Sequence, residues 1–220
     1  MKRLLPYVLM LALVGCGGKT PLSPTRTPIP DPAPAPANRN PVINSLTVNP
    51  TFAIAFLTPF TYGASASDPD GDTLTYIWDL AGNERSGSSG SITFSRGFTG
   101  IFRLTVTDGR GGSASDTRTV TCGSMTGTWR GTFASFIFTS NLTQSGGVVT
   151  GDYVDQDGPG RLDPSSANTI NPRGEIVLRY KQSVFTDFTF RGTMDNTGRR
   201  ITGGVSGSGL NNTPFVMTKQ

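Results

Sequence analysis

The feature that most constrains the fold is a repeating alternation of short apolar runs and turn signals after residue 41. Apolar and polar residues alternate within each run, and sequences such as DPDGD, AGNERSGSSG and DGRGG separate the runs. Strict alternation is typical of a half-buried strand, whereas an amphipathic helix needs a period of about 3.6 residues. No stretch of ten or more residues in the region after residue 41 has the helical period. The pattern therefore predicts an all-β protein.

The first block of strands, residues 42–123, is predicted to form a β-sandwich. Several short strands at regular spacing with turn signals between them are typical of that architecture. The expected strands are 42–48, 60–67, 73–80, 91–95, 101–107 and 113–122. Each strand should bury one face against the opposite sheet. The residues expected at the centre of this core are Trp78, Phe102, Leu104 and Val106.

The second block, residues 124–220, is richer in glycine and is predicted to be a separate domain. Its expected strands are 126–133, 135–143, 147–154, 160–163, 174–181, 183–194, 199–205 and 213–219. Eight antiparallel strands are the number that closes a small up-and-down barrel. An open two-sheet sandwich is the alternative architecture for this block.

The N-terminus predicts export. Lys2 and Arg3 precede an apolar stretch that is too short to span a bilayer but fits a signal peptide over residues 1–15. The stretch ends in LVGC at Cys16, which resembles the lipobox of bacterial lipoproteins. The resemblance implies cleavage before Cys16, a diacylglycerol on its sulfur and a fatty acyl group such as palmitate on its new amino group. An ordinary secretory signal with an accidental cysteine is the alternative.

Several acyl chains on one residue would anchor the protein stably in a membrane. By the same resemblance, Gly17 in place of Asp implies the outer membrane. Residues 16–41 form the lipidated cysteine and a linker that holds eight of the chain's 16 prolines. Such a segment favours extended polyproline II conformation, and we expect it to act as a stalk in the cell envelope.

Composition excludes several classes of function. The chain has no histidine, which removes Ser-His-Asp catalysis and histidine-ligated metal sites. Its net charge of +4 is spread out without a dense basic cluster, so nucleic acid is not an expected partner. If Cys16 carries lipid, Cys122 has no partner for an intramolecular disulfide. We expect no catalytic residue and no enzyme activity.

A family resemblance supports the sandwich. DPDGDTLTYIWDL followed by FRLTVTDGRGGSASDTRTVT resembles the PKD-type domain over residues 42–122. The resemblance implies an immunoglobulin-like fold that serves as a spacer or as a protein or glycan contact module, with calcium bound in some members. The sequence departs from the family after Trp78, where Asp79-Leu80-Ala81-Gly82 stands in place of Asp-Phe-Gly-Asp.

The DPDGD segment carries the one candidate metal site. Asp68, Asp70 and Asp72 offer hard oxygen ligands of the kind that calcium prefers. An EF-hand is excluded because Thr73 stands where that loop requires glycine. The alternative, which we favour, is a type I turn in which Asp68 receives backbone N–H groups. Calcium at these three aspartates is the one cofactor that the sequence suggests.

The start of the second block has a looser resemblance. TGTW followed by LTQSGGVVTGDY is similar to the opening of avidin-type and lipocalin-type barrels. The resemblance implies ligand-binding roles for Trp129, Ser135 and Tyr153, while Gly131 replaces an asparagine that binds ligand in avidins. The alternative is that aromatic side chains fill the barrel; these are Trp129, Phe133, Phe138, Phe188, Phe190 and Phe215.

These observations predict a lipid-anchored envelope protein that acts as a non-catalytic binding or scaffold module, contacting an envelope protein or a glycan. The first alternative is a carrier of a small apolar ligand in the barrel. The second is a hydrolase that uses carboxylates, for which Asp155 and Asp157 are the candidates.

Overall fold

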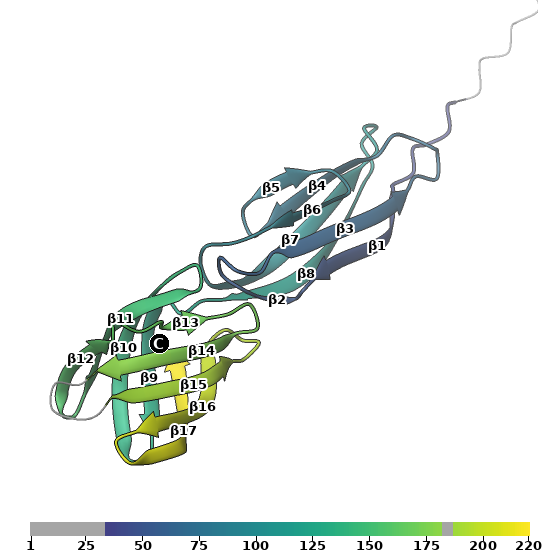
Figure 1. The fold of residues 1–220 in the computed structure, drawn as a ribbon. Coiled ribbons are helices and arrows are strands. Elements are labelled where there is room, and N and C mark those ends of the chain that lie inside the picture. The colour runs from purple at the N-terminus through teal and green to yellow at the C-terminus, as the bar shows by residue number, and fades with distance from the viewer. Residues whose placement is uncertain (1–33, 182–186) are drawn as a thin grey trace, which may run out of the picture. The chain divides into compact units, whose positions relative to one another are not determined.

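The computed structural model describes residues 34–181 and 187–220, of which Ala37–Gln220 form one compact unit. All regular elements in these residues are β-strands (Figure 1), so the predicted fold class is confirmed. Within the same residues, no helix has the length and apolar character needed to cross a membrane.

Two sheets form the N-terminal domain. The smaller sheet has the order β1 (Val42–Asn49), β3 (Phe60–Ser67), β6 (Ser89–Ile92). The larger has the order β2 (Phe52–Ile54), β8 (Ser113–Gly123), β7 (Phe98–Thr107), β4 (Thr75–Leu80), β5 (Glu84–Ser86). All neighbours are antiparallel except β2 and β8, which are parallel. The sequence predicted the six longer strands and missed β2 and β5.

The sandwich core lies between these sheets. Its centre contains the four residues predicted from the sequence, all fully buried: Trp78, Phe102, Leu104 and Val106. Phe60 from the smaller sheet meets Phe102 edge to face, with ring centroids 5.3 Å apart. Such pairs add about 0.5–1.5 kcal/mol beyond the apolar area that they bury. Cys122 is buried in this core, and burial raises the pKa of its thiol to about 11.

The C-terminal domain is a closed barrel of eight antiparallel strands. Their order is β10 (Phe136–Ser145), β9 (Gly127–Phe133), β17 (Leu210–Lys219), β16 (Arg200–Gly207), β15 (Phe188–Met194), β14 (Glu175–Lys181), β12 (Gly158–Leu162), β11 (Val148–Asp155). Pairing of β11 with β10 closes the ring, and the short β13 (Thr169–Ile170) bridges β11 and β14. The predicted barrel is thus confirmed; part of the strand expected at 183–194 lies outside the described residues.

Aromatic side chains fill most of the barrel, and the sequence predicted them. Five of the six are buried, namely Trp129, Phe133, Phe138, Phe190 and Phe215. Phe138 lies across Gly131, its partner on the neighbouring strand. A Cβ atom at residue 131 would lie 2.1 Å from Cζ of Phe138, so only glycine leaves room for the ring.

One end of the barrel is sealed by the segment that follows β2. Ile54 belongs to the barrel's hydrophobic core. The side chain of Gln144, near the end of β10, donates to the carbonyls of Ala55 at 2.8 Å and Gly146 at 3.0 Å, and accepts from the Met125 N–H at 2.9 Å. Because Gln144 and Phe136 lie near opposite ends of β10, this seal leaves the Phe136 end open.

The glycine at position 131 gives a direct test of this packing. Gly131→Ala should lower the free energy of unfolding by about 1–3 kcal/mol, the usual cost of overpacking a core. Gly63→Ala is the control, because a Cβ there meets its nearest neighbours at 3.4 Å or more. Denaturant unfolding of both variants measures the difference. Equal stability of the two variants would contradict the packing described.

Candidate functional site

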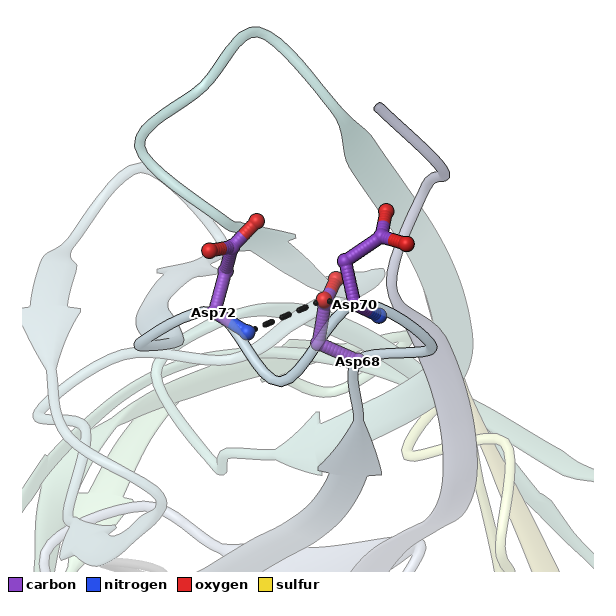
Figure 2. A group of neighbouring side chains, drawn as sticks. All are labelled: Asp68, Asp70 and Asp72. Atoms are coloured by element: carbon purple, nitrogen blue, oxygen red, sulfur yellow. Dashed lines mark hydrogen bonds between the residues drawn. The ribbon is translucent and has the colours of Figure 1, made fainter. Parts of the chain in front are cut away.

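The acidic turn predicted between β3 and β4 is present. The Gly71 N–H donates to the carbonyl of Asp68 at 3.2 Å. One carboxylate oxygen of Asp68 accepts the N–H groups of Asp70 at 2.8 Å and Asp72 at 3.1 Å (Figure 2). Carboxylate oxygens of the three aspartates lie within 4.8 Å of one another. The segment therefore forms the tight turn and also gathers three potential metal ligands.

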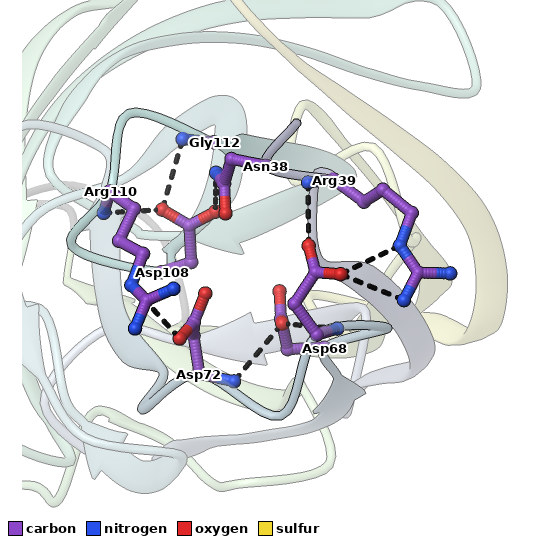
Figure 3. Close-up of polar contacts among 8 residues, drawn as sticks. Asn38, Arg39, Asp68, Asp72, Asp108, Arg110 and Gly112 are labelled. Atoms are coloured by element: carbon purple, nitrogen blue, oxygen red, sulfur yellow. Dashed lines mark hydrogen bonds and ion pairs between the residues drawn. The ribbon is translucent and has the colours of Figure 1, made fainter. Parts of the chain in front are cut away.

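Two arginines contact this cluster (Figure 3). Arg39 donates to Asp70 from Nε at 2.8 Å and from its backbone N–H at 2.7 Å, and Nη2 makes an ion pair at 2.7 Å. These contacts hold the pKa of Asp70 below its ordinary value of 3.8. Arg110 pairs with Asp72 at 3.1 Å. The sequence analysis missed both arginines because they are distant from the turn along the chain.

Asp108, in the DGRGG turn between β7 and β8, repeats the geometry of Asp68. One of its oxygens accepts the N–H groups of Arg110 at 2.7 Å and Gly112 at 2.9 Å. Its other oxygen accepts from the Asn38 side chain at 2.7 Å, and this bond is the main cause of the lowered pKa of Asp108. The Asp-x-x-x-Gly spacing was the available signal for this turn.

Two carboxylate oxygens in the acidic turn have no hydrogen-bond partner. These are Oδ2 of Asp68 and Oδ2 of Asp72, and both are buried. Only 10% of the Asp72 side chain is exposed. A buried oxygen that carries charge and lacks a partner is costly, and a cation with flexible oxygen coordination would satisfy both. The donor set fits calcium.

A second candidate site lies at the open end of the barrel. A hollow of about 230 Å³ there is lined by Phe133, Phe136, Asp155, Asp157, Phe188, Ser208 and Leu210. These residues come from the ends of β9, β10, β11, β15 and β17 and from the turns next to them, and we call the hollow the barrel mouth. Phe136, Phe188 and Leu210 are half-buried, so their apolar surface faces the hollow without being covered.

A smaller cavity of about 20 Å³ adjoins the barrel mouth on its core side. It shares Phe133, Phe136, Asp155 and Phe188 with the mouth and adds four buried residues, Phe138, Tyr153, Tyr180 and Phe190. This volume holds about one water molecule.

The two tyrosines of this cavity differ in their hydrogen bonding. The hydroxyl groups of Tyr180 and Ser140 are bonded at 2.9 Å. The Tyr153 hydroxyl has no partner although only 4% of the residue is exposed. Burial raises the pKa of Tyr153 to about 12, and the carboxylates of Asp155, Asp157 and Asp187 add to the shift. Tyr153 therefore remains neutral and presents a free hydroxyl to the cavity.

The three ligand-binding candidates occupy different places. Tyr153 lines the cavity next to the barrel mouth. Trp129 is fully buried, and its indole N–H donates to the Met125 carbonyl at 2.8 Å, so it is a core residue. Ser135 is exposed in the turn between β9 and β10. The structure brings neither Trp129 nor Ser135 to the lining of the mouth.

The pairing of Arg39 with Asp70 predicts a measurable titration. In Arg39→Ala the pKa of Asp70 should rise toward 3.8, while the backbone N–H of residue 39 retains part of the shift. The sign follows from linkage: a lowered pKa stabilises the fold above about 3.8, and this contribution disappears as the pH falls through the lower folded value. Carboxyl-carbon NMR titration measures it, with Asp108 as the internal reference. An unchanged Asp70 titration would contradict the contact.

Comparisons with known proteins chiefly concern the first domain. Residues 38–121 match the family model of a bacterial Ig domain. The crystal structure of the PKD1 domain of Vibrio anguillarum Epp is 26% identical, and the match covers 39% of this chain and 96% of that one at a TM-score of 0.33.

A structure described for the promiscuous specificity of carbohydrate-binding modules from the β-sandwich superfamily is 17% identical. The match covers 84% of this chain and 93% of that chain, at a TM-score of 0.38. Comparison with curated proteins finds no match. Together with the strand topology, the family match identifies residues 38–121 as an immunoglobulin-like sandwich.

Proposed function

We propose that this protein is a non-catalytic binding module of the cell envelope, held by lipid on Cys16, and that it binds a small ligand at the barrel mouth. The lipid anchor rests on the lipobox-like LVGC sequence. The ligand site rests on one observation, the hollow of about 230 Å³ lined by uncovered phenylalanine and leucine side chains.

The shape of the mouth favours a small ligand over a protein or glycan held on a flat surface. Small-molecule sites are concave and mostly apolar, with a few placed polar groups and volumes of about 300–1,000 Å³. The barrel mouth approaches this size, and Tyr153, whose hydroxyl is unpartnered, lines the smaller cavity next to it. Burial of apolar surface supplies about 25 cal/mol per Å², so covering these side chains would favour binding.

The same geometry favours binding over carboxylate chemistry. The Asp157 N–H donates to a carboxylate oxygen of Asp155 at 2.9 Å, which is the pattern of an aspartate that stabilises its own turn. Tyr153, with its pKa raised to about 12, is a weak acid at neutral pH. A ligand would therefore meet a surface that binds and orients it.

Phe136 provides the test of the barrel mouth. The uncharged probe N-phenyl-1-naphthylamine should bind the full chain and brighten, and Phe136→Ala should weaken its affinity about tenfold, because the variant loses a ring that stacks on Phe133 at 5.2 Å. Ile137→Ala is the matched control, since this neighbour is 48% exposed and lies outside the lining. Fluorescence titration measures both. Absence of binding by the wild type, or equal loss in the control, would overturn the proposal.

A second candidate function is calcium binding by the acidic turn, and the buried, unpartnered oxygens of Asp68 and Asp72 favour it. Sites of this type in extracellular modules bind in the range of about 0.1–1 mM. Occupancy of the turn would stiffen the link between β3 and β4 and so support a spacer role for the sandwich.

Calcium binding predicts a rise in thermal stability. At ten times the dissociation constant, calcium should add about 1.4 kcal/mol to the free energy of unfolding. Asp72→Asn should abolish this gain by removing the charge on the buried carboxylate. Asp116→Asn, on the surface beside Arg118, should retain it. Calorimetry with and without calcium measures the melting temperature of each variant. A wild-type melting temperature that calcium leaves unchanged would refute this function.

A further inference from the structure

We infer that the barrel mouth selects an amphiphilic cation, a small molecule with an aromatic or apolar body and a protonated amine. The inference rests on the proposed function, because it names the chemical class of ligand for the same hollow. It goes beyond the small apolar ligand that the sequence offered as an alternative function. It is carried by the charges around the mouth, the aromatic faces in it and the Tyr153 hydroxyl in the adjoining cavity.

The charged side chains that line the mouth are acidic. Asp155 and Asp157 belong to the lining, and Asp187 acts with them to disfavour the ionised form of Tyr153. Among the described residues, the lining contains no lysine or arginine. Residues 182–186 read QSVFT and add no formal charge. The potential at the mouth therefore favours a positive ligand group and disfavours a carboxylate or phosphate.

Two basic residues on the neighbouring strands β12 and β14 face away from the barrel interior. Arg161 on β12 lies opposite Lys181 on β14 in the strand register, and both residues are exposed. Their strand neighbours Leu162 and Tyr180 are buried in the barrel core. Because successive side chains of a strand point to opposite faces, these two cations lie on the outer surface and do not neutralise the mouth.

The aromatic rings offer faces that suit a cation. Phe133 and Phe136 are stacked with an interplanar angle of 16°, and the ring of Phe188 lies 5.6 Å from that of Phe133. The face of an aromatic ring is the negative end of its quadrupole, and a desolvated cation over it gains about 2 kcal/mol. A purely apolar ligand would use the area of these rings without this electrostatic contribution.

The Tyr153 hydroxyl supplies a specific contact. It is buried, neutral and unpartnered, and it borders a cavity that holds about one water molecule. Its oxygen can accept an N–H from an ammonium group, directly or through that water. The rim carboxylates, the ring faces and this oxygen thus make one site for an amine on an apolar body.

A matched series of three probes tests the inference on the full chain at pH 7. The probes are 1-naphthylmethylamine, 1-naphthalenemethanol and 1-naphthoic acid, which share one ring system and differ in charge. Isothermal titration calorimetry should give the amine about tenfold tighter binding than the alcohol, and the acid about tenfold weaker binding. The advantage of the amine should shrink at high salt, because exposed charges are then screened.

Two variants connect this preference to the rim. Asp157→Asn should reduce the advantage of the amine over the alcohol about threefold. Asp152→Asn removes the same charge from the outer face of β11, where Asp152 contacts Asn141 at 3.3 Å, and should leave all three affinities unchanged.

The outcomes separate the two proposals. Equal binding of the amine and the alcohol, or tighter binding of the acid, would overturn the cation inference and leave the ligand-binding function standing. Failure of all three probes, together with failure of the uncharged dye, would overturn the function itself. An amine advantage of undiminished size in Asp157→Asn would overturn its assignment to this rim.

Discussion

The barrel depends on aromatic rings that lie across glycines on neighbouring strands. Phe138 covers Gly131, and the ring of Tyr153 occupies the place where a Cβ of Gly160 would stand, 2.3 Å from Cε1. A closed ring of eight strands leaves little interior space, so large rings fit only where the facing residue has no side chain. These two pairs place Phe138 and Tyr153 in the lining of the small cavity on the core side of the barrel mouth.

The strands were predictable because their signal is local. Alternation marks one buried face, and it located every strand of the barrel except the two-residue β13. The missed strands β2 and β5 have three residues each, too few to show a period. β2 exists because it pairs in parallel with β8, a contact between segments far apart in sequence.

The backbone conformation of the acidic turn could be predicted from the sequence, but the side chains that contact its aspartates could not. Asp-Pro-Asp-Gly is a turn sequence because proline presets φ and the first aspartate accepts nearby N–H groups. The pairing of Arg39 with Asp70 spans 31 residues and that of Asn38 with Asp108 spans 70. Only the assembled sandwich brings these side chains together, and no period or spacing in the sequence encodes the contact.

Register explains why the ligand-binding candidates implied by the resemblance to known barrels lie in different places. Trp129 and Phe133 both face the interior from β9, but only Phe133 reaches the barrel mouth, because it stands at the end of the strand beside the turn to Phe136. Gly131, which replaces a ligand-binding asparagine, is required by the ring of Phe138. The position that binds ligand in avidins therefore serves packing in this barrel.

Two polar side chains of the barrel, Gln144 and Tyr153, differ in how the fold satisfies them. The Gln144 side chain, near the end of β10, makes three hydrogen bonds, so its amide is satisfied within the fold. By contrast, the buried hydroxyl of Tyr153, which lies on β11 opposite Ser140, lacks a partner, and an unmet group of this kind costs about 1–3 kcal/mol. A ligand or water that bonds this hydroxyl recovers part of that cost. Under the proposed function, the free energy of ligand binding would include this recovered contribution.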